Sequence, residues 1–140
     1  MFASARSLVD LHPPTLDQAI LAEFIMEGHF GHHLRRMRQT YAERMDVLKT
    51  AADKHLSGVL DVVHAGAGIR TIGWLKTWRS DQDAARQARA LGLEVTPLSM
   101  FAMKYQQPPA LMLGFAGCNP AELRRGVSVL ATALHSPKTP

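Results

Sequence analysis

The spacing of apolar residues along the first part of the chain predicts two consecutive helices. Within residues 15–27 the apolar positions recur every three or four residues, as on one face of an amphipathic helix. Pro14 suits the entry to this helix and Gly28 its end. A second, longer helix is expected over residues 29–55. Its apolar stripe consists of Phe30, Leu34, Met37, Tyr41, Met45 and Leu48.

The apolar pattern changes period after the second helix, which predicts strands. Residues 59–64 and 69–75 predict two strands with a glycine turn or bulge between them. Residues 93–95 predict a short strand before Pro97, and the apolar run 110–115 predicts another after a Gln-Gln-Pro-Pro breaker.

Cap residues mark two further helices. Asp81 is expected to be the N-cap of a third helix that closes at Gly92. Asn119 is expected to cap the last helix, with Pro120 in its first turn. The residues of this last helix that are expected to face inward are Val127, Leu130, Ala131 and Leu134.

This order of elements predicts an α/β (α+β) two-layer sandwich of modest size. The chain has 140 residues, of which 46% are hydrophobic and 20% charged, as in one globular domain. We expect this domain to span residues 15–134. Residues 1–14 are expected to form an N-terminal leading segment and residues 135–140 a flexible tail.

Targeting and membrane signals are missing from the sequence. Asp10 and His12 interrupt the start before the apolar run of a signal peptide can form. No apolar stretch approaches the roughly 18–20 residues of a membrane-spanning helix. The single cysteine, Cys118, fits a reducing compartment. The expected location is the cytoplasm, without membrane contact.

A cluster of histidines raises the possibility of a metal site. His29, His32 and His33 stand at helical spacings from which all three can reach one ion. They fall in the first turn of the helix, however, and no carboxylate stands at a spacing suited to orient them. We therefore expect no metal site.

The positive charge raises the possibility of nucleic-acid binding. The net charge is +4 and the isoelectric point about 9.6. Arg35, Arg36 and Arg38 nevertheless spread over about half the circumference of their helix, at ~100° per residue. Acidic residues interrupt the positive field further along the same helix. A free-standing nucleic-acid binder remains a third hypothesis, which predicts steep salt dependence of binding.

The chain resembles one known family through four segments in a fixed order. These segments are PPTLDQAILAEFIMEGHFGHHLRRMRQTYAERMDVL, HAGAGIRTIGWL, ALGLEVTPLSMF and PPALMLGFAGCNPAELRRGVSVLATAL. They resemble the C-terminal small domain of MocR-type regulators. Those proteins join an N-terminal GntR-type winged-helix domain to a body similar to fold-type-I, pyridoxal-phosphate-dependent aminotransferases of class I and II. The resemblance extends over residues 7–134.

The resemblance implies that the cofactor is held elsewhere. In the family, pyridoxal phosphate forms a Schiff base with a lysine of the large domain, in a Ser-x-Ser-Lys-like segment. The lysines of this chain do not stand in such a context; they are Lys49, Lys54, Lys76, Lys104 and Lys138. We therefore expect no catalytic and no cofactor-binding residue in this chain.

The family also implies a substrate-binding residue that this chain lacks. An arginine on the last strand of the small domain pairs with the α-carboxylate of the substrate. In LMLGFAG, Met112 stands at that position. Arg70 is the reserve candidate for this carboxylate, and His64, just before the glycine turn, is a second candidate for the cleft. The alternatives are that Arg70 lies on the outer face of an exposed strand and that His64 is structural.

Two functional hypotheses follow from the resemblance. The first is a C-terminal fragment of a MocR/GntR-type regulator, an effector-sensing small domain without catalysis of its own. The second is a fragment or subunit of a pyridoxal-phosphate-dependent aminotransferase that a separate large-domain chain completes. The expected partner in both is the large domain. DNA would be bound only through the N-terminal domain, and an exposed apolar face would favour self-association.

Overall fold

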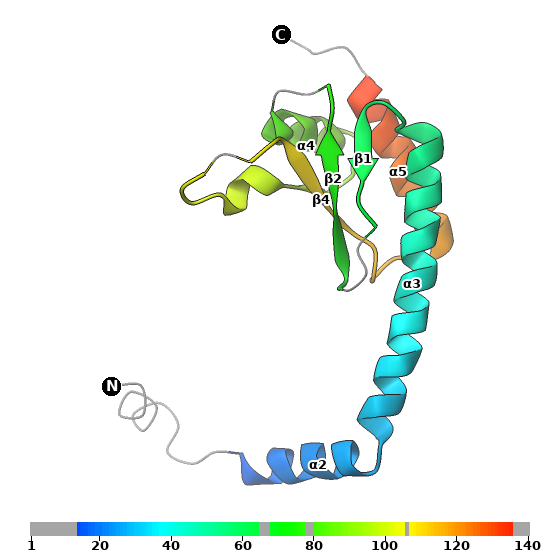
Figure 1. Cartoon of the computed structure of the whole chain (residues 1–140), viewed down its shortest axis with the longest axis vertical. Helices are drawn as coiled ribbons and strands as arrows, with labels where there is room; N and C mark the ends of the chain where they lie inside the picture. Colours follow the sequence, from blue (N-terminus) through cyan, green and yellow to red (C-terminus); the bar gives the residue numbers. More distant parts are fainter. Residues whose placement is uncertain (1–13, 65–67, 78–79, 106, 136–140) are drawn as a thin grey trace. The chain divides into compact units, whose positions relative to one another are not determined.

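The fold is described from a computed structural model, which describes residues 14–64, 68–77, 80–105 and 107–135 (Figure 1). The chain divides into two compact units, residues 1–38 and residues 39–140. The elements in chain order are α2 (Thr15–Met26), α3 (His29–His55), β1 (Leu60–Val62), β2 (Arg70–Leu75), α4 (Asp81–Ala90), β3 (Thr96–Pro97), the 3-10 helix η1 (Leu98–Phe101), β4 (Ala110–Gly114) and α5 (Pro120–His135).

The first unit contains α2 and the beginning of α3, both of which were predicted. Gly28 lies between them with φ of +82°, a left-handed conformation that glycine adopts without steric cost. Helix α2 buries none of its residues. Its exposed large apolar side chains are Leu16, Ile20, Leu21, Phe24, Ile25 and Met26.

The predicted apolar stripe of α3 is buried only in its second half. Met45 and Leu48 belong to the core of the second unit, with 1% and 5% of their surface exposed. Phe30 and Leu34 are exposed. Helical spacing therefore identified the face of α3 correctly, but which turns of that face are covered depends on the neighbouring elements.

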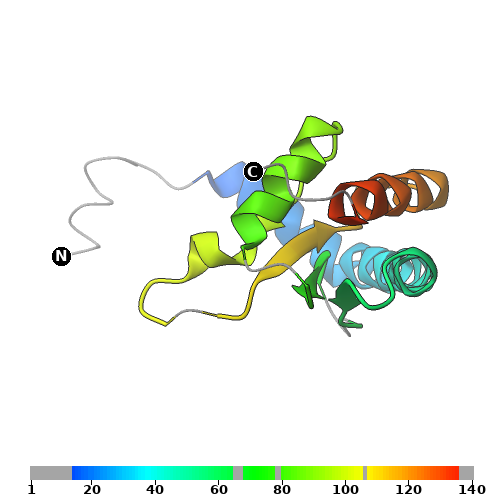
Figure 2. The ribbon, with the colours of Figure 1, turned by 90° about the horizontal axis from the view of Figure 1, so that it is seen from above.

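The second unit is built on a four-stranded antiparallel sheet with the order β1-β2-β4-β3. Along β2, and along β4 from Leu111 onward, buried positions alternate with partly exposed ones, so the sheet has one covered face. Buried residues of the strands form one apolar cluster with buried residues of α3, α4 and α5. Figure 2 shows α3 and α5 side by side next to the sheet. The predicted two-layer α+β sandwich is confirmed.

The two strands around the glycine turn were predicted with bounds that are too wide. Val63 continues the pairing of β1 with one further bond, in which its N–H donates to the carbonyl of Ile72 at 3.0 Å. Gly68 has φ of +98°, consistent with the predicted turn. Gly66 lies outside the described residues.

The predicted strand over residues 93–95 is wrong. Strand β3 begins only at Thr96 and pairs with β4. The N–H of Leu93 instead donates to the carbonyl of Ala88 at 3.0 Å, after Gly92 with φ of +79°. Leu93 is therefore part of the C-terminal cap of α4. The unpredicted η1 follows directly after Pro97, whose missing N–H is tolerated because β3 is an edge strand.

The predicted N-cap of α4 is also wrong. Ser80 is the N-cap, and its Oγ accepts from the N–H of Asp83 at 3.2 Å. Asp81 is the first helical residue and only 4% exposed. Its Oδ2 accepts from the N–H of Ser99 at 2.8 Å and its Oδ1 from the hydroxyl of Ser99 at 2.7 Å. The Asp81 carboxylate thus binds Ser99 in η1, and the side chain of Ser80 caps α4 instead.

The cap of α5 is confirmed and forms a capping box. Asn119 Oδ1 accepts from the N–H groups of Ala121 and Glu122, both at 3.0 Å. Glu122 Oε2 accepts from the N–H of Asn119 at 2.8 Å. Helix α5 extends to His135, the last described residue. Residues 1–13 and 136–140, which contain most of the predicted leading segment and tail, lie outside the described residues.

Candidate functional site

The face of the sheet away from the core carries the candidate carboxylate-binding residue. In β2 the buried positions alternate with Arg70, Ile72 and Trp74, which therefore share the other face. The register pairs Ile72 with Met112 on β4, so the Met112 side chain lies on that face too. The Arg70 guanidinium is exposed, and its Nη1 donates to Met112 Sδ at 3.5 Å. Arg70 thus contacts Met112, the residue that the resemblance places at the position of the family arginine.

A hollow of about 260 Å³ adjoins Arg70 on this face. Val63, Ile72 and Trp74 provide apolar walls, with the Arg70 guanidinium as the charged group. The hydroxyl of Thr71 is already used, because it donates to the carbonyl of Val63 at 2.5 Å. A hollow with one cation and apolar walls can accept a carboxylate that carries an apolar group.

The structure does not bring His64 into this hollow. His64 Nε2 lies 3.3 Å from Oδ1 of Asp46 on α3, and both side chains are exposed. By the alternation along the β1 strand, His64 is on the opposite face of the sheet from Arg70. The geometry fits the structural alternative for His64.

The described lysines lie at the surface, and two of them contact a carboxylate. Lys49 pairs with Asp53, and Lys76 Nζ is 4.0 Å from Asp61 Oδ2. The other described lysines, Lys54 and Lys104, are exposed; Lys138 lies outside the described residues. A lysine that forms a Schiff base is usually desolvated or placed beside another cation. Of the described lysines, Lys54 shares a groove with Arg124 but is exposed to solvent.

The histidines at the start of α3 also differ from the sequence-based picture. His29 Nε2 lies 3.0 Å from Glu27 Oε2, so a carboxylate does contact one of them, contrary to expectation. The His29 ring also lies 5.7 Å from that of Phe24. Within residues 14–64, 68–77, 80–105 and 107–135, no three His, Cys, Asp or Glu side chains are grouped so that they could hold a metal ion.

One surface ion pair, between Arg89 and Glu94, shifts the pKa values of both of its members. Arg89 donates to both carboxylate oxygens of Glu94, at 3.0 and 2.5 Å. The hydrogen bonds from this guanidinium lower the pKa of the Glu94 carboxyl, and those to Glu94 raise the pKa of Arg89. Both side chains are exposed, so this bidentate pair joins the end of α4 to the segment before β3 at the surface.

Sequence reasoning missed the apolar partners of Arg70. The signal was available, because a period of two over residues 69–75 places Ile72 and Trp74 on the face of Arg70. The sequence could not give the register of β2 with β4, which places Met112 beside Arg70.

In the described part of the chain, no helix is both long and apolar enough to cross a membrane.

Comparison with known proteins agrees with the resemblance seen in the sequence. No family profile matches the chain. Over 124 residues it is 36% identical to the probable rhizopine catabolism regulatory protein MocR of Rhizobium meliloti, covering 87% of this chain and 25% of that protein. Over 116 residues it is 25% identical to the uncharacterized HTH-type transcriptional regulator YdeL of Bacillus subtilis, covering 83% of this chain and 25% of that protein.

Solved aminotransferases share the fold. The α-aminoadipate aminotransferase LysN of Thermus thermophilus superposes with a TM-score of 0.80 and 25% identity over 94% of this chain and 33% of LysN. A multiple-substrate aminotransferase of Thermococcus profundus gives a TM-score of 0.82 and 21% identity over 93% of this chain and 32% of its own.

The chain thus spans about a quarter of the length of the regulators and a third of that of the aminotransferases. The sequence relatives include regulators and an uncharacterized aminotransferase of Saccharolobus solfataricus, and the structural neighbours are aminotransferases. The resemblance inferred from the four sequence segments is confirmed. Over most of its length the chain is similar to MocR and related HTH-type regulators, and it shares the fold of about a third of an aminotransferase.

Proposed function

We propose that this chain serves as the effector-sensing small domain of a MocR-type, aminotransferase-like transcriptional regulator. In this proposal it supplies the face that binds the carboxylate of an amino compound, and it has no catalytic activity of its own. The large domain supplies the lysine and the pyridoxal phosphate, and a winged-helix domain contacts DNA. The regulator homologues support this larger context.

The observation that carries the proposal is the 3.5 Å contact between Arg70 Nη1 and Met112 Sδ. In the family, a carboxylate-binding arginine occupies the position of Met112. Because Arg70 reaches that position from the neighbouring strand, a guanidinium is available where the family places one. A guanidinium binds a carboxylate through two parallel hydrogen bonds, which fix the orientation of the ligand as well as its affinity.

The hollow beside Arg70 extends the proposal to the class of ligand. Val63, Ile72 and Trp74 offer apolar surface to the part of the ligand next to its carboxylate. Binding across the face of the sheet and the large domain would favour a closed arrangement of the two domains, and this closure would transmit the signal.

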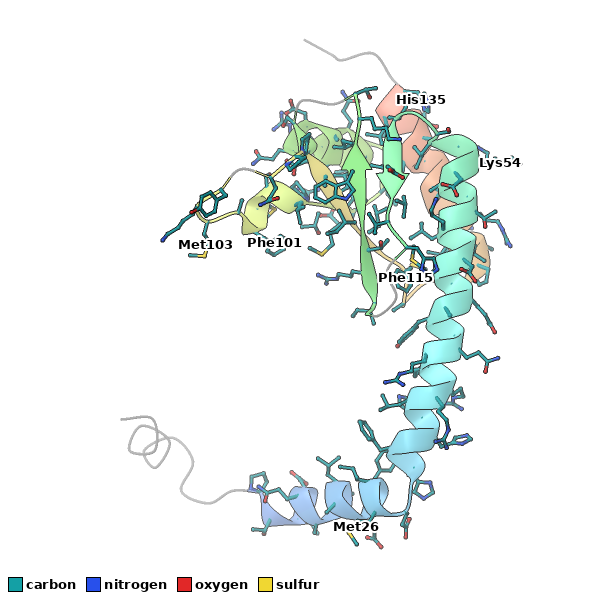
Figure 3. The ribbon with its side chains drawn as sticks, in the orientation of Figure 1. Met26, Lys54, Phe101, Met103, Phe115 and His135 are labelled. Carbon is teal, nitrogen blue, oxygen red and sulfur yellow. The ribbon has the colours of Figure 1, made fainter. Side chains whose placement is uncertain are left out.

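Exposed apolar side chains outside the hollow fit the proposed partner. Met100, Phe101, Met103 and Tyr105 are all more than half exposed in η1 and the segment after it. Figure 3 shows Phe101 and Met103 projecting from this region. We propose that a large domain covers such surface in the assembled protein. Self-association of the isolated chain through its exposed apolar residues stays a prediction, as does a cytoplasmic location.

Removing the Arg70 guanidinium is expected to weaken binding of a carboxylated amino compound by about 10- to 100-fold, the loss of a charge-assisted hydrogen-bonded pair. The measurement is calorimetric titration of the protein together with its large domain, comparing Arg70→Ala with Arg70→Lys. Arg70→Lys keeps the charge and is expected to recover part of the affinity. Adding Met112→Arg to Arg70→Ala is expected to restore binding.

The matched control is Arg86→Ala, which removes an exposed arginine of α4 that pairs with Asp83. It should leave binding unchanged. An analogue of the ligand with an alcohol in place of the carboxylate should bind the wild type and Arg70→Ala equally. If Arg70→Ala binds the carboxylated compound as well as the wild type does, Arg70 is not the carboxylate partner.

The two functional hypotheses differ in where the large domain is encoded. A C-terminal epitope tag placed on the chromosomal gene is expected to reveal one polypeptide much larger than the 15.4 kDa of this chain. A tagged 15.4 kDa chain that purifies with a separate large-domain protein would support the two-chain aminotransferase instead. A tagged 15.4 kDa chain without such a partner would contradict both hypotheses.

A further inference from the structure

A groove of about 470 Å³ lies between α3 and α5, on the helical side of the second unit. Lys54 and His55 line it from α3, and Arg124 lines it from α5. Figure 3 shows Lys54 at the surface of α3, near its C-terminal end. The groove has the size of a small-molecule site. It lies on the helical layer, whereas Arg70 lies on the uncovered face of the sheet.

The two permanent cations of this groove, Lys54 and Arg124, form no ion pair with a described residue. Among the described residues no side chain pairs with or accepts from Lys54, His55 or Arg124. The one carboxylate in the lining is Asp46, and it is engaged by His64 at 3.3 Å. Several surface cations outside the groove do contact a carboxylate: Lys49, Lys76, Arg86 and Arg89.

Helix electrostatics explain only part of this arrangement. Lys54 and His55 occupy the last turn of α3, where the helix dipole favours positive charge. Arg124 is the fifth residue of α5, beyond the first turn, where the helix dipole no longer has a marked effect on a charge. Arg124 places a second positive charge across the groove from Lys54, and the electrostatics of α5 do not account for its position.

The neutral groups of the groove add one donor and an apolar floor. Thr50 lines the groove, and its hydroxyl has no hydrogen-bond partner among the described residues. The Ser128 hydroxyl is already used, because it donates to the carbonyl of Arg124 at 3.1 Å. Val47 and Ala51 provide apolar surface. The groove thus offers two permanent cations, a hydroxyl and apolar surface, beside one carboxylate, that of Asp46.

We propose that this groove binds a small phosphate-bearing anion, with Arg124 and Lys54 holding the phosphoryl oxygens and Thr50 donating a further hydrogen bond. A phosphate monoester carries a charge of about −1.5 to −2 near neutral pH, and Lys54 and Arg124 offset most of it even beside the Asp46 carboxylate. The guanidinium of Arg124 supplies the paired donors that phosphate geometry favours. The volume beyond the phosphoryl group accommodates the rest of the ligand. This site does not depend on the function proposed above.

The test uses the full 140-residue chain and pyrophosphate as the probe, titrated by calorimetry at low ionic strength. We expect saturable binding of one pyrophosphate per chain. Arg124→Ala is expected to weaken it by about 10-fold or more, the loss of one charge-assisted contact. Arg125→Ala is the matched control, because it removes the same charge from the next residue, which is exposed and does not line the groove. It is expected to change affinity by less than about two-fold.

A second measurement locates the probe. Backbone amide shifts in a nuclear magnetic resonance titration should change in residues 50–55 and 124–128. Absence of saturable binding would overturn the proposal. If Arg124→Ala and Arg125→Ala weaken the affinity for pyrophosphate or duplex DNA equally, the anion is attracted to a basic surface in general. That result would also overturn the proposal. So would shifts confined to the Arg70 strand.

Discussion

Replacing Phe115 with alanine is expected to lower the free energy of unfolding by about 3–5 kcal/mol, the usual cost of deleting a buried phenyl ring. Phe115 follows β4 directly and is 2% exposed within the apolar cluster formed by the sheet and its three helices. Its N–H donates to the carbonyl of Ile69 at 3.3 Å, so the backbone is fixed and the site can collapse little. The loss therefore includes both transfer and cavity costs. Urea unfolding followed by circular dichroism measures it.

Phe101→Ala is the matched control for this prediction. It deletes the same ring from η1, where Phe101 is 58% exposed (Figure 3). Its effect should stay within about 0.5 kcal/mol, as for other surface substitutions. Equal destabilisation by the two variants would mean that Phe115 is not part of the core.

Asp81→Ala is expected to lower the free energy of unfolding by about 1.5–3 kcal/mol, because hydrogen bonds to a buried charged group are lost. The Asp81 carboxylate accepts from both the N–H and the hydroxyl of Ser99, and the variant leaves these donors without an acceptor. Asp81→Asn retains one acceptor oxygen and should fall between the wild type and Asp81→Ala. The same urea titration measures both variants.

The control for Asp81 is Asp83→Ala in the same helical turn. Asp83 also carries a negative charge near the N-terminus of α4, but its side chain is half exposed and pairs with Arg86. Its loss should cost less than about 1 kcal/mol. If the two variants are equally destabilised, the helix dipole explains the effect of Asp81, and its bonds to Ser99 contribute little.

The contact between Asp81 and Ser99 also bears on the candidate site. Ser99 lies in η1, directly after β3, and β3 pairs with β4 through Thr96 and Met112. Loss of Asp81 should therefore loosen the strand that flanks Met112 as well as the start of α4. A weaker response of carboxylate binding to Asp81→Ala than to Arg70→Ala is expected, because Asp81 acts on the site only through β3.

Several elements could be predicted because their signals are local in the chain. Gly28 and Gly92 end helices where a left-handed residue is required, and Asn119 caps α5 through its own side chain. The bounds of α3 follow from apolar spacing between Gly28 and the change of period after His55. The family resemblance is equally local, since it rests on segments whose order does not depend on how they pack.

Local signals failed where a distant residue decided the outcome. Asp81 has the chemistry of an N-cap, but Ser99 occupies its carboxylate and Ser80 takes the cap. The short strand begins at Thr96 because Leu93 is bound to the end of α4. In each case a contact formed by folding outweighed a propensity that is worth about 1 kcal/mol or less.

The candidate site likewise combines residues that the sequence predicts with contacts that only folding forms. The resemblance predicted that Met112 stands at the position of the family arginine, and the sequence alone offered Arg70, near a glycine turn, as the reserve candidate. Only the register of β2 with β4 decided that Arg70, 42 residues away, reaches Met112 Sδ. Likewise, only the packing of α3 against α5 brought Lys54 and Arg124 to one groove. Residue types follow from the chain alone, whereas the distances between remote side chains exist only once strand register and helix packing are fixed.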